Sequence, residues 1–95
     1  MIKIQVDSVT PISKILPGRR FFVDMESGAK LIDLLRKLTK DYGQEFYDAV
    51  CSEDGYDEQK ISLLVNGVSV IFLGGVDIQL KDGDAVLILP LLCGG

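Results

Sequence analysis

Residues 28–43 read GAKLIDLLRKLTKDYG, and they predict the one long helix around which the strands can be placed. Its apolar side chains recur about every 3.6 residues and form one stripe along a helix. The stripe consists of Leu31, Leu34, Leu35, Leu38 and Tyr42, and Asp33, Arg36, Lys37 and Lys40 take the opposite face. The pattern predicts an amphipathic helix with Ser27 as its N-cap and Gly43 as its end.

Two strands are predicted before this helix. In the first, Ile2, Ile4 and Val6 alternate with polar residues, the period-two pattern of a strand with one buried face. The second covers Arg20–Met25, which is rich in aromatic and β-branched side chains. The segment between them, residues 7–19, is expected to be a loop with a short helical turn.

Three further strands are predicted after the helix. The segments expected there are a shorter helix at 44–50, a solvated acidic loop at 52–60 and strands at 61–65, 68–72 and 85–89. Asn66-Gly67 is a strong hairpin signal between the first two of these strands. The near-continuous apolar run of the last is typical of a strand covered on both faces in the centre of a sheet. The order predicts an α+β domain with one sheet packed on the long helix.

Composition excludes several classes of function. A chain of 95 residues has room for one domain, and its net charge of −4 is opposite to that of proteins that bind nucleic acid or anionic membranes. The absence of histidine argues against a metal site and against an independent enzyme. Two cysteines and no apolar run of membrane-spanning length predict a cytoplasmic protein.

The last five residues, Leu91-Leu92-Cys93-Gly94-Gly95, are the strongest candidate for a functional site. We expect residues 1–90 to form the domain and residues 91–95 an extended tail, because Pro90 ends the last strand. Two terminal glycines make such a tail narrow enough to enter another protein's active site. The terminal carboxylate is ionised and resists nucleophiles, and the chain has no phosphate-binding loop of the Walker type. Activation would therefore come from a partner enzyme.

Several short motifs occur in an order that is more specific than any one of them. They are Leu64-Val65-Asn66-Gly67, Leu80-Lys81-Asp82-Gly83-Asp84-Ala85-Val86, Pro90 and the terminal Gly94-Gly95. In this order, and over nearly its whole length, the chain resembles the MoaD/ThiS superfamily of ubiquitin-like sulfur carriers. The resemblance implies the β-grasp (ubiquitin-like) fold, a mixed sheet packed on one main helix.

The resemblance also implies a chemistry. In such proteins an activating enzyme adenylates the terminal glycine, and a sulfur donor converts it to a thiocarboxylate that passes the sulfur on. By resemblance, Gly95 would carry the sulfur and Gly94 would give access to it, with molybdopterin biosynthesis as the first choice of pathway. Small subunits of molybdopterin synthases usually have paired prolines and a small residue before Gly-Gly, whereas Leu91, Leu92 and Cys93 follow Pro90 here.

The chain length is closer to that of eukaryotic and archaeal relatives that also modify proteins. The second hypothesis is therefore a protein modifier joined through Gly95 to lysines of target proteins. A third is an interaction domain whose Gly-Gly end is incidental. The resemblance implies no bound cofactor, an adenylyltransferase partner similar to ubiquitin-activating enzymes that uses ATP, and a sulfur acceptor such as the molybdopterin synthase large subunit.

One helix covers only one face of a sheet, so the other face is expected to dock these partners. We expect Phe22 and Leu87 on that face, with Leu91, Leu92 and Cys93 contacting partners from the tail. The alternative is that residues 7–19 or 43–60 cover it.

Other polar and reactive residues have structural interpretations. Asp82 and Asp84 flank Gly83 and are read as turn formers, and Arg19-Arg20 is read as a solvated pair at a strand entrance. Cys51 is interpreted as a small hydrophobic residue at a helix end, and Cys93 as a neutral side chain of the tail.

Overall fold

The computed structural model describes residues 1–52 and 55–91. In chain order its elements are β1 (Ile2–Ser8), the 3-10 helix η1 (Ile12–Lys14), β2 (Arg20–Met25), α1 (Leu31–Tyr42), α2 (Gln44–Val50), β3 (Cys51–Ser52), β4 (Gly55–Tyr56), β5 (Ile61–Val65), β6 (Val68–Ser69), α3 (Val70–Leu73) and β7 (Ala85–Pro90). None of the described helices has the length and apolar character needed to cross a membrane.

The main sheet has five strands in the order β2-β1-β7-β5-β6. The first strand pairs with the last in parallel, and the other pairs are antiparallel. The predicted central position of the strand at 85–89 is confirmed, because β7, which extends to Pro90, lies between β1 and β5. The Asn66-Gly67 hairpin is also confirmed, with positive φ at both residues as a type I′ turn requires.

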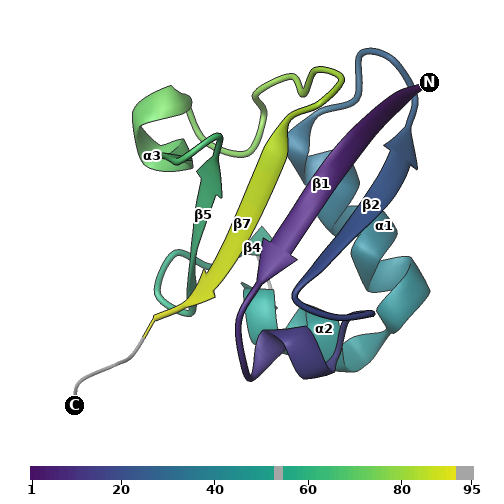
Figure 1. The fold of residues 1–95 in the computed structure, drawn as a ribbon. Helices are drawn as coiled ribbons and strands as arrows, with labels where there is room; N and C mark the ends of the chain where they lie inside the picture. The colour runs from purple at the N-terminus through teal and green to yellow at the C-terminus, as the bar shows by residue number, and fades with distance from the viewer. Residues whose placement is uncertain (53–54, 92–95) are drawn as a thin grey trace.

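Helix α1 lies against one face of this sheet (Figure 1). The predicted stripe is confirmed, since its four leucines are buried with the inward-facing residues of the strands. Residues 7–19 and the described part of 43–60 contribute Ile12, Leu16, Phe46 and Val50 to the same core. They therefore pack on the helix side of the sheet and do not cover the opposite face.

The helix begins later than the sequence predicts, and Ser27 is not its N-cap. Lys30 occupies that position, and the Asp33 carboxylate accepts a hydrogen bond from the Lys30 N–H at 2.9 Å. The first helical amide groups, of Leu31 and Ile32, donate to carbonyls of the segment before β7. These tertiary bonds replace a side-chain cap. Gly43 ends the helix as predicted, and α2 follows directly.

Three other predictions need correction. Residues 68–72 are not one strand, because the Ser69 Oγ accepts the Ile71 N–H and starts the short helix α3. The segment at 52–60 is not simply a solvated loop, since Cys51–Ser52 and Gly55–Tyr56 form a small antiparallel pair. β7 is covered fully on one face only, where Val86 and Ile88 are buried, while Leu87 and Leu89 on the other face are half-buried.

Candidate functional site

The predicted tail begins where β7 ends. Ile61 of β5 is the cross-strand partner of Pro90, and one residue later the Leu91 N–H donates to the Lys60 carbonyl at 3.0 Å. Leu91 is exposed and is the last residue described. Leu92, Cys93, Gly94 and Gly95 lie outside the described residues. The structure thus describes the base of the tail but not its reactive end.

Lys60 connects the base of the tail to the end of α2. Its Nζ donates to the carbonyls of Asp48 at 3.0 Å and Cys51 at 2.7 Å, while its own carbonyl accepts from Leu91. The ammonium thus binds carbonyl groups at a helix C-terminus, where a positive charge is favoured. Neither Lys60 nor Asp48 was singled out from sequence, because nothing in the local pattern shows that the two meet.

The thiol of Cys51 is buried beside this corner. Burial raises its pKa above the ordinary value, and the nearby positive charge of Lys60 offsets part of that rise. A thiol that stays protonated is a poor nucleophile. The interpretation of Cys51 as a small hydrophobic residue is therefore confirmed.

The sheet face opposite α1, here called the open face, carries a mixture of apolar and polar side chains. Phe22 on β2 is 58% exposed, and Leu87 on β7 is half-buried directly opposite Leu64 on β5. Phe22 and Leu87 are not neighbours, since β1 separates their strands. The expected uncovered face is present, but its apolar part lies on β5 and β7, with Phe22 two strands away.

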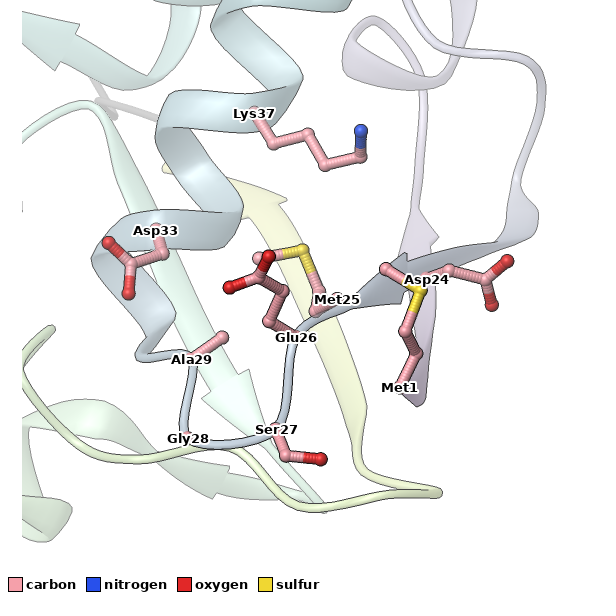
Figure 2. Close-up of a pocket in the computed structure, with 9 residues that line it drawn as sticks. All are labelled: Met1, Asp24, Met25, Glu26, Ser27, Gly28, Ala29, Asp33 and Lys37. Atoms are coloured by element: carbon pink, nitrogen blue, oxygen red, sulfur yellow. The ribbon is translucent and has the colours of Figure 1, made fainter.

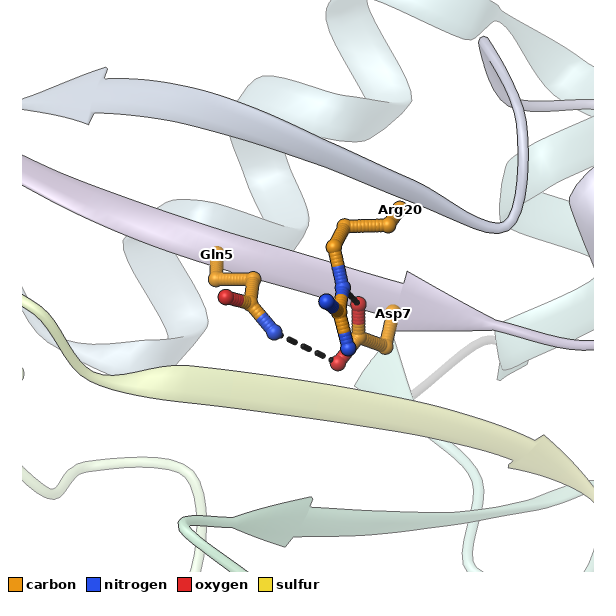
Figure 3. Close-up of polar contacts among 3 residues, drawn as sticks. All are labelled: Gln5, Asp7 and Arg20. Atoms are coloured by element: carbon orange, nitrogen blue, oxygen red, sulfur yellow. Dashed lines mark hydrogen bonds and ion pairs between the residues drawn. The ribbon is translucent and has the colours of Figure 1, made fainter.

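A polar cluster occupies the open face between Phe22 and Leu87 (Figure 3). Asp7 accepts a hydrogen bond from the Gln5 Nε2 at 2.8 Å and forms an ion pair with the Arg20 Nε at 2.9 Å. Arg20 is therefore paired, although its side chain remains 65% exposed. The alternation of β1 places Gln5 and Asp7 on the face opposite Ile4 and Val6, and this is the sequence signal for the cluster.

The aspartates of the 81–84 turn are occupied by structural hydrogen bonds. Asp82 accepts from the Lys3 N–H at 2.8 Å, and Asp84 accepts from the Lys81 N–H at 2.8 Å and the Asn66 Nδ2 at 2.9 Å. Their interpretation as turn formers is confirmed, and both lie at the end of β7 opposite the tail.

A hollow of about 530 Å³ opens between α1 and β2, lined in part by Glu26, Asp33 and Lys37 (Figure 2). The Asp33 carboxylate accepts a hydrogen bond from the Lys30 N–H and forms an ion pair with Arg36 at 3.9 Å. Among residues 1–52 and 55–91, no group of three or more metal-ligating side chains converges. The hollow is separate from the base of the tail.

Comparisons with known proteins agree with this architecture. The model of the ThiS family matches residues 14–95. Small archaeal modifier protein 3 of Haloferax volcanii is 34% identical over 74 residues, which cover 75% of this chain and 75% of that protein. A protein of Archaeoglobus fulgidus assigned as a sulfur carrier is 33% identical over 66 residues, 70% of each chain.

A solved structure from Pyrococcus furiosus, assigned as molybdopterin converting factor subunit 1, has a TM-score of 0.79 and 28% identity to this chain, covering 97% of it and 100% of the solved chain. The predicted β-grasp fold is thereby confirmed. These relatives are described as a modifier, a sulfur carrier and a converting-factor subunit. The chain belongs to the ThiS family and, with it, to the MoaD/ThiS superfamily of ubiquitin-like sulfur carriers and protein modifiers.

Proposed function

We propose that the protein is a sulfur carrier whose C-terminal Gly95 is adenylated by a partner enzyme, converted to a thiocarboxylate and used as a sulfur donor, with molybdopterin biosynthesis as the first choice of pathway. The observation that carries the proposal is the family match, which extends to the terminal Gly94-Gly95. The strand that leads to these glycines is the central strand of the sheet, and Leu91 at its end is bonded to Lys60.

The chemistry follows from the state of the terminus. The ionised Gly95 carboxylate attacks the α-phosphorus of ATP on the partner enzyme, and pyrophosphate leaves. A sulfide equivalent from a sulfur donor then attacks the carbonyl carbon and displaces AMP, which leaves a thiocarboxylate. The carrier contributes a narrow end without side chains, and the partner supplies the phosphate-binding groups.

The open face is the proposed docking surface for the activating and sulfur-accepting enzymes. Leu87, Leu64 and Leu89 supply half-buried apolar surface on β5 and β7, the two strands that meet at the base of the tail. The Gln5–Asp7–Arg20 cluster supplies a fixed polar group beside it, and Arg20 is oriented by Asp7. Apolar centres with charged rims are typical of specific interfaces. Phe22 and the tail residues Leu91, Leu92 and Cys93 complete the set of proposed contacts.

A second candidate is a modifier joined through Gly95 to target lysines. The similarity to small archaeal modifier protein 3 favours it. Both candidates require the same adenylated terminus. They differ only in the nucleophile that attacks the Gly95 carbonyl carbon and displaces AMP. A lysine amine gives an isopeptide bond, whereas a sulfur donor gives the thiocarboxylate.

The test is intact mass spectrometry after incubation with the host's activating enzyme, ATP and a sulfur donor. We expect a mass gain equal to the replacement of one oxygen by sulfur, absent from a chain that lacks Gly95. Addition of a molybdopterin synthase large subunit and its precursor should then return the carrier to its original mass. Lysine-linked Gly95 peptides in cells would instead support the modifier, and no adenylate with an active cognate enzyme would refute both.

A further inference from the structure

Strand β2 forms one edge of the main sheet, and backbone groups on its outer side have no hydrogen-bond partner in the described part of the chain. The Ser8 N–H donates to the Arg19 carbonyl, so these two residues form a hydrogen-bonded pair of the antiparallel ladder. Along β2, residues that bond to β1 then alternate with residues whose N–H and C=O groups point away from it. Phe21, Val23 and Met25 consequently bond to β1, while the N–H and C=O groups of Phe22 and Asp24 face outward. A strand edge of this kind can pair with an added strand.

Two adjacent hollows follow this edge on the side of α1. One, of about 410 Å³, is lined by residues that include Phe21, Leu38 and Tyr42, and the other is the hollow of about 530 Å³ described above. Both are lined by Met1, Asp24 and Lys37. The rings of Phe21 and Tyr42 meet edge to face with centroids 6.0 Å apart and give the first hollow an aromatic wall. Side chains of an added strand would have room here.

The charges along the edge favour a basic occupant. Lys37 is paired with Asp41 at 3.6 Å, and Asp33 is paired with Arg36. Asp24 and Glu26 are exposed and form no ion pair with any residue in the described part of the chain. Figure 2 shows Glu26 between α1 and β2, with Asp24 projecting outward near Met1. The residues that line the two hollows carry four carboxylates, those of Asp24, Glu26, Asp33 and Asp41, and two positive charges, those of Lys37 and the Met1 amino group. The edge therefore has a small excess of negative charge.

We propose that the β2 edge binds an extended basic segment of a partner protein, which adds to the sheet as a sixth strand. Alternate side chains of an added strand point to opposite faces. Those directed towards α1 would be apolar and fill the hollow beside Phe21 and Tyr42. Those on the open face would be lysine or arginine, placed across from Phe22 and Asp24, where cation–π and ion-pair contacts are available. This site does not involve Gly95, and it shares only Phe22 with the proposed docking surface.

A second copy of this chain fits the edge less well. Its own β2 would bring inward side chains of Val23 and Met25 that are already buried in its core. Because these side chains are packed in the core of their own copy, they cannot fill the hollows of the other copy. An extended segment with uncommitted side chains satisfies both the backbone edge and the hollows.

The test uses the full ¹⁵N-labelled chain and an acetylated, amidated peptide in which three valines alternate with three lysines. We expect saturable shifts at Phe22, Asp24 and Tyr42, and slower hydrogen exchange of the Phe22 and Asp24 amides in the complex. The matched peptide with glutamates in place of lysines should bind at least tenfold more weakly. No ATP or activating enzyme is present, so this result is separate from that of the carrier assay.

Two controls distinguish edge pairing from general attraction. N-methylation of the peptide amides that face β2 keeps every side chain and should abolish binding. The double variant Asp24→Asn, Glu26→Gln should weaken binding about threefold to tenfold, whereas Glu45→Gln, Glu58→Gln, with the same change in charge elsewhere, should not. Equal binding of both peptides, undiminished binding of the N-methylated peptide, or shifts confined to β5 and β7 would overturn the proposal. Dimerisation through β2 in sedimentation experiments would also overturn it.

Discussion

The two ends of the β5–β7 pair are built differently. At the end that contains Asn66 and Asp84, side chains and backbone form a dense set of hydrogen bonds, including Asn66 Oδ1 with the Ala85 N–H at 3.0 Å. At the other end Pro90 is paired with Ile61, and the Leu91 N–H donates to the Lys60 carbonyl. The carboxylates of Asp82 and Asp84 therefore lie at the end away from the tail, where their hydrogen bonds stabilise the fold.

This difference separates stability from function along one pair of strands. A group whose hydrogen bonds are all used within the fold has little capacity left for a partner, whereas half-buried apolar side chains and an exposed tail base are available to one. We therefore expect substitutions near the tail and on the open face to affect activation more than stability. Substitutions at the turn should do the reverse.

The largest effect is expected for Leu87→Lys on the open face. A lysine there places a charge in the centre of the proposed docking surface, and loss of a contact at an interface hot spot costs about 2 kcal/mol or more. We expect kcat/KM for activation, measured as pyrophosphate release, to fall about thirtyfold or more. The melting temperature should change little, because the side chain is only half-buried.

Leu73→Lys is the matched control for this prediction. Leu73 is an exposed leucine of α3, on the side of the turn, and it receives the same change in charge. Its activation kinetics should match those of the unmodified chain. Equal losses for the two variants would mean that the open face has no special role.

The next largest effect is expected for Asn66→Ala, which should lower the free energy of unfolding by about 2 kcal/mol. The substitution removes the acceptor for the Ala85 N–H and the donor to Asp84 and leaves alanine at a φ of 52°. Asn66→Gly loses the same hydrogen bonds without the backbone strain and should cost less. Urea unfolding measures both values, and activation of the folded variants should be unchanged. If either variant were as stable as the parent chain but slower in activation, the turn end would serve function and not stability, contrary to the comparison above.

The sequence was sufficient to predict the elements whose signals are local. The leucine stripe of α1, the Asn66-Gly67 turn and the apolar run of β7 were each predicted at the correct place. The errors arose where distant residues decide the structure. Ser27 is not a cap because Leu31 and Ile32 donate to carbonyls near β7. The apolar pattern of residues 68–72 does not by itself distinguish a strand from a short helix.

The candidate site divides in the same way. Its position at the tail could be predicted from the terminal Gly-Gly, and Gly94 and Gly95 remain predictions because they lie outside the described residues. The Asp7–Arg20 pair and the contacts of Lys60 could not be found from local pattern, since each joins residues more than eight positions apart.

A smaller effect is expected for Lys60→Met. The variant removes the ammonium that binds the carbonyls of Asp48 and Cys51, and it keeps most of the side-chain length. The free energy of unfolding should fall by about 1 kcal/mol. The Leu91 amide should exchange its hydrogen several times faster, because the corner that fixes its acceptor is loosened. Exchange followed by NMR tests this, with Lys14→Met, a lysine at the end of η1, as the control. Unchanged exchange at Leu91 would show that β5 alone fixes the base of the tail.

The smallest effect concerns Cys51 and alkaline pH. Burial raises the pKa of its thiol in the folded protein, so on raising the pH the unfolded chain loses this proton first. The stabilising contribution is fully present below the unfolded pKa of about 8.5 and declines as the pH rises towards the folded pKa. The pKa of the Tyr56 hydroxyl is also raised by burial, and its contribution declines at higher pH. Urea unfolding between pH 7 and 11 should show a decline that Cys51→Ala reduces above about pH 8.5 and Tyr56→Phe reduces above about pH 10. An identical decline in Cys51→Ala and the parent chain would mean that the thiol ionises equally in both states, and that the corner beside Lys60 is open to solvent.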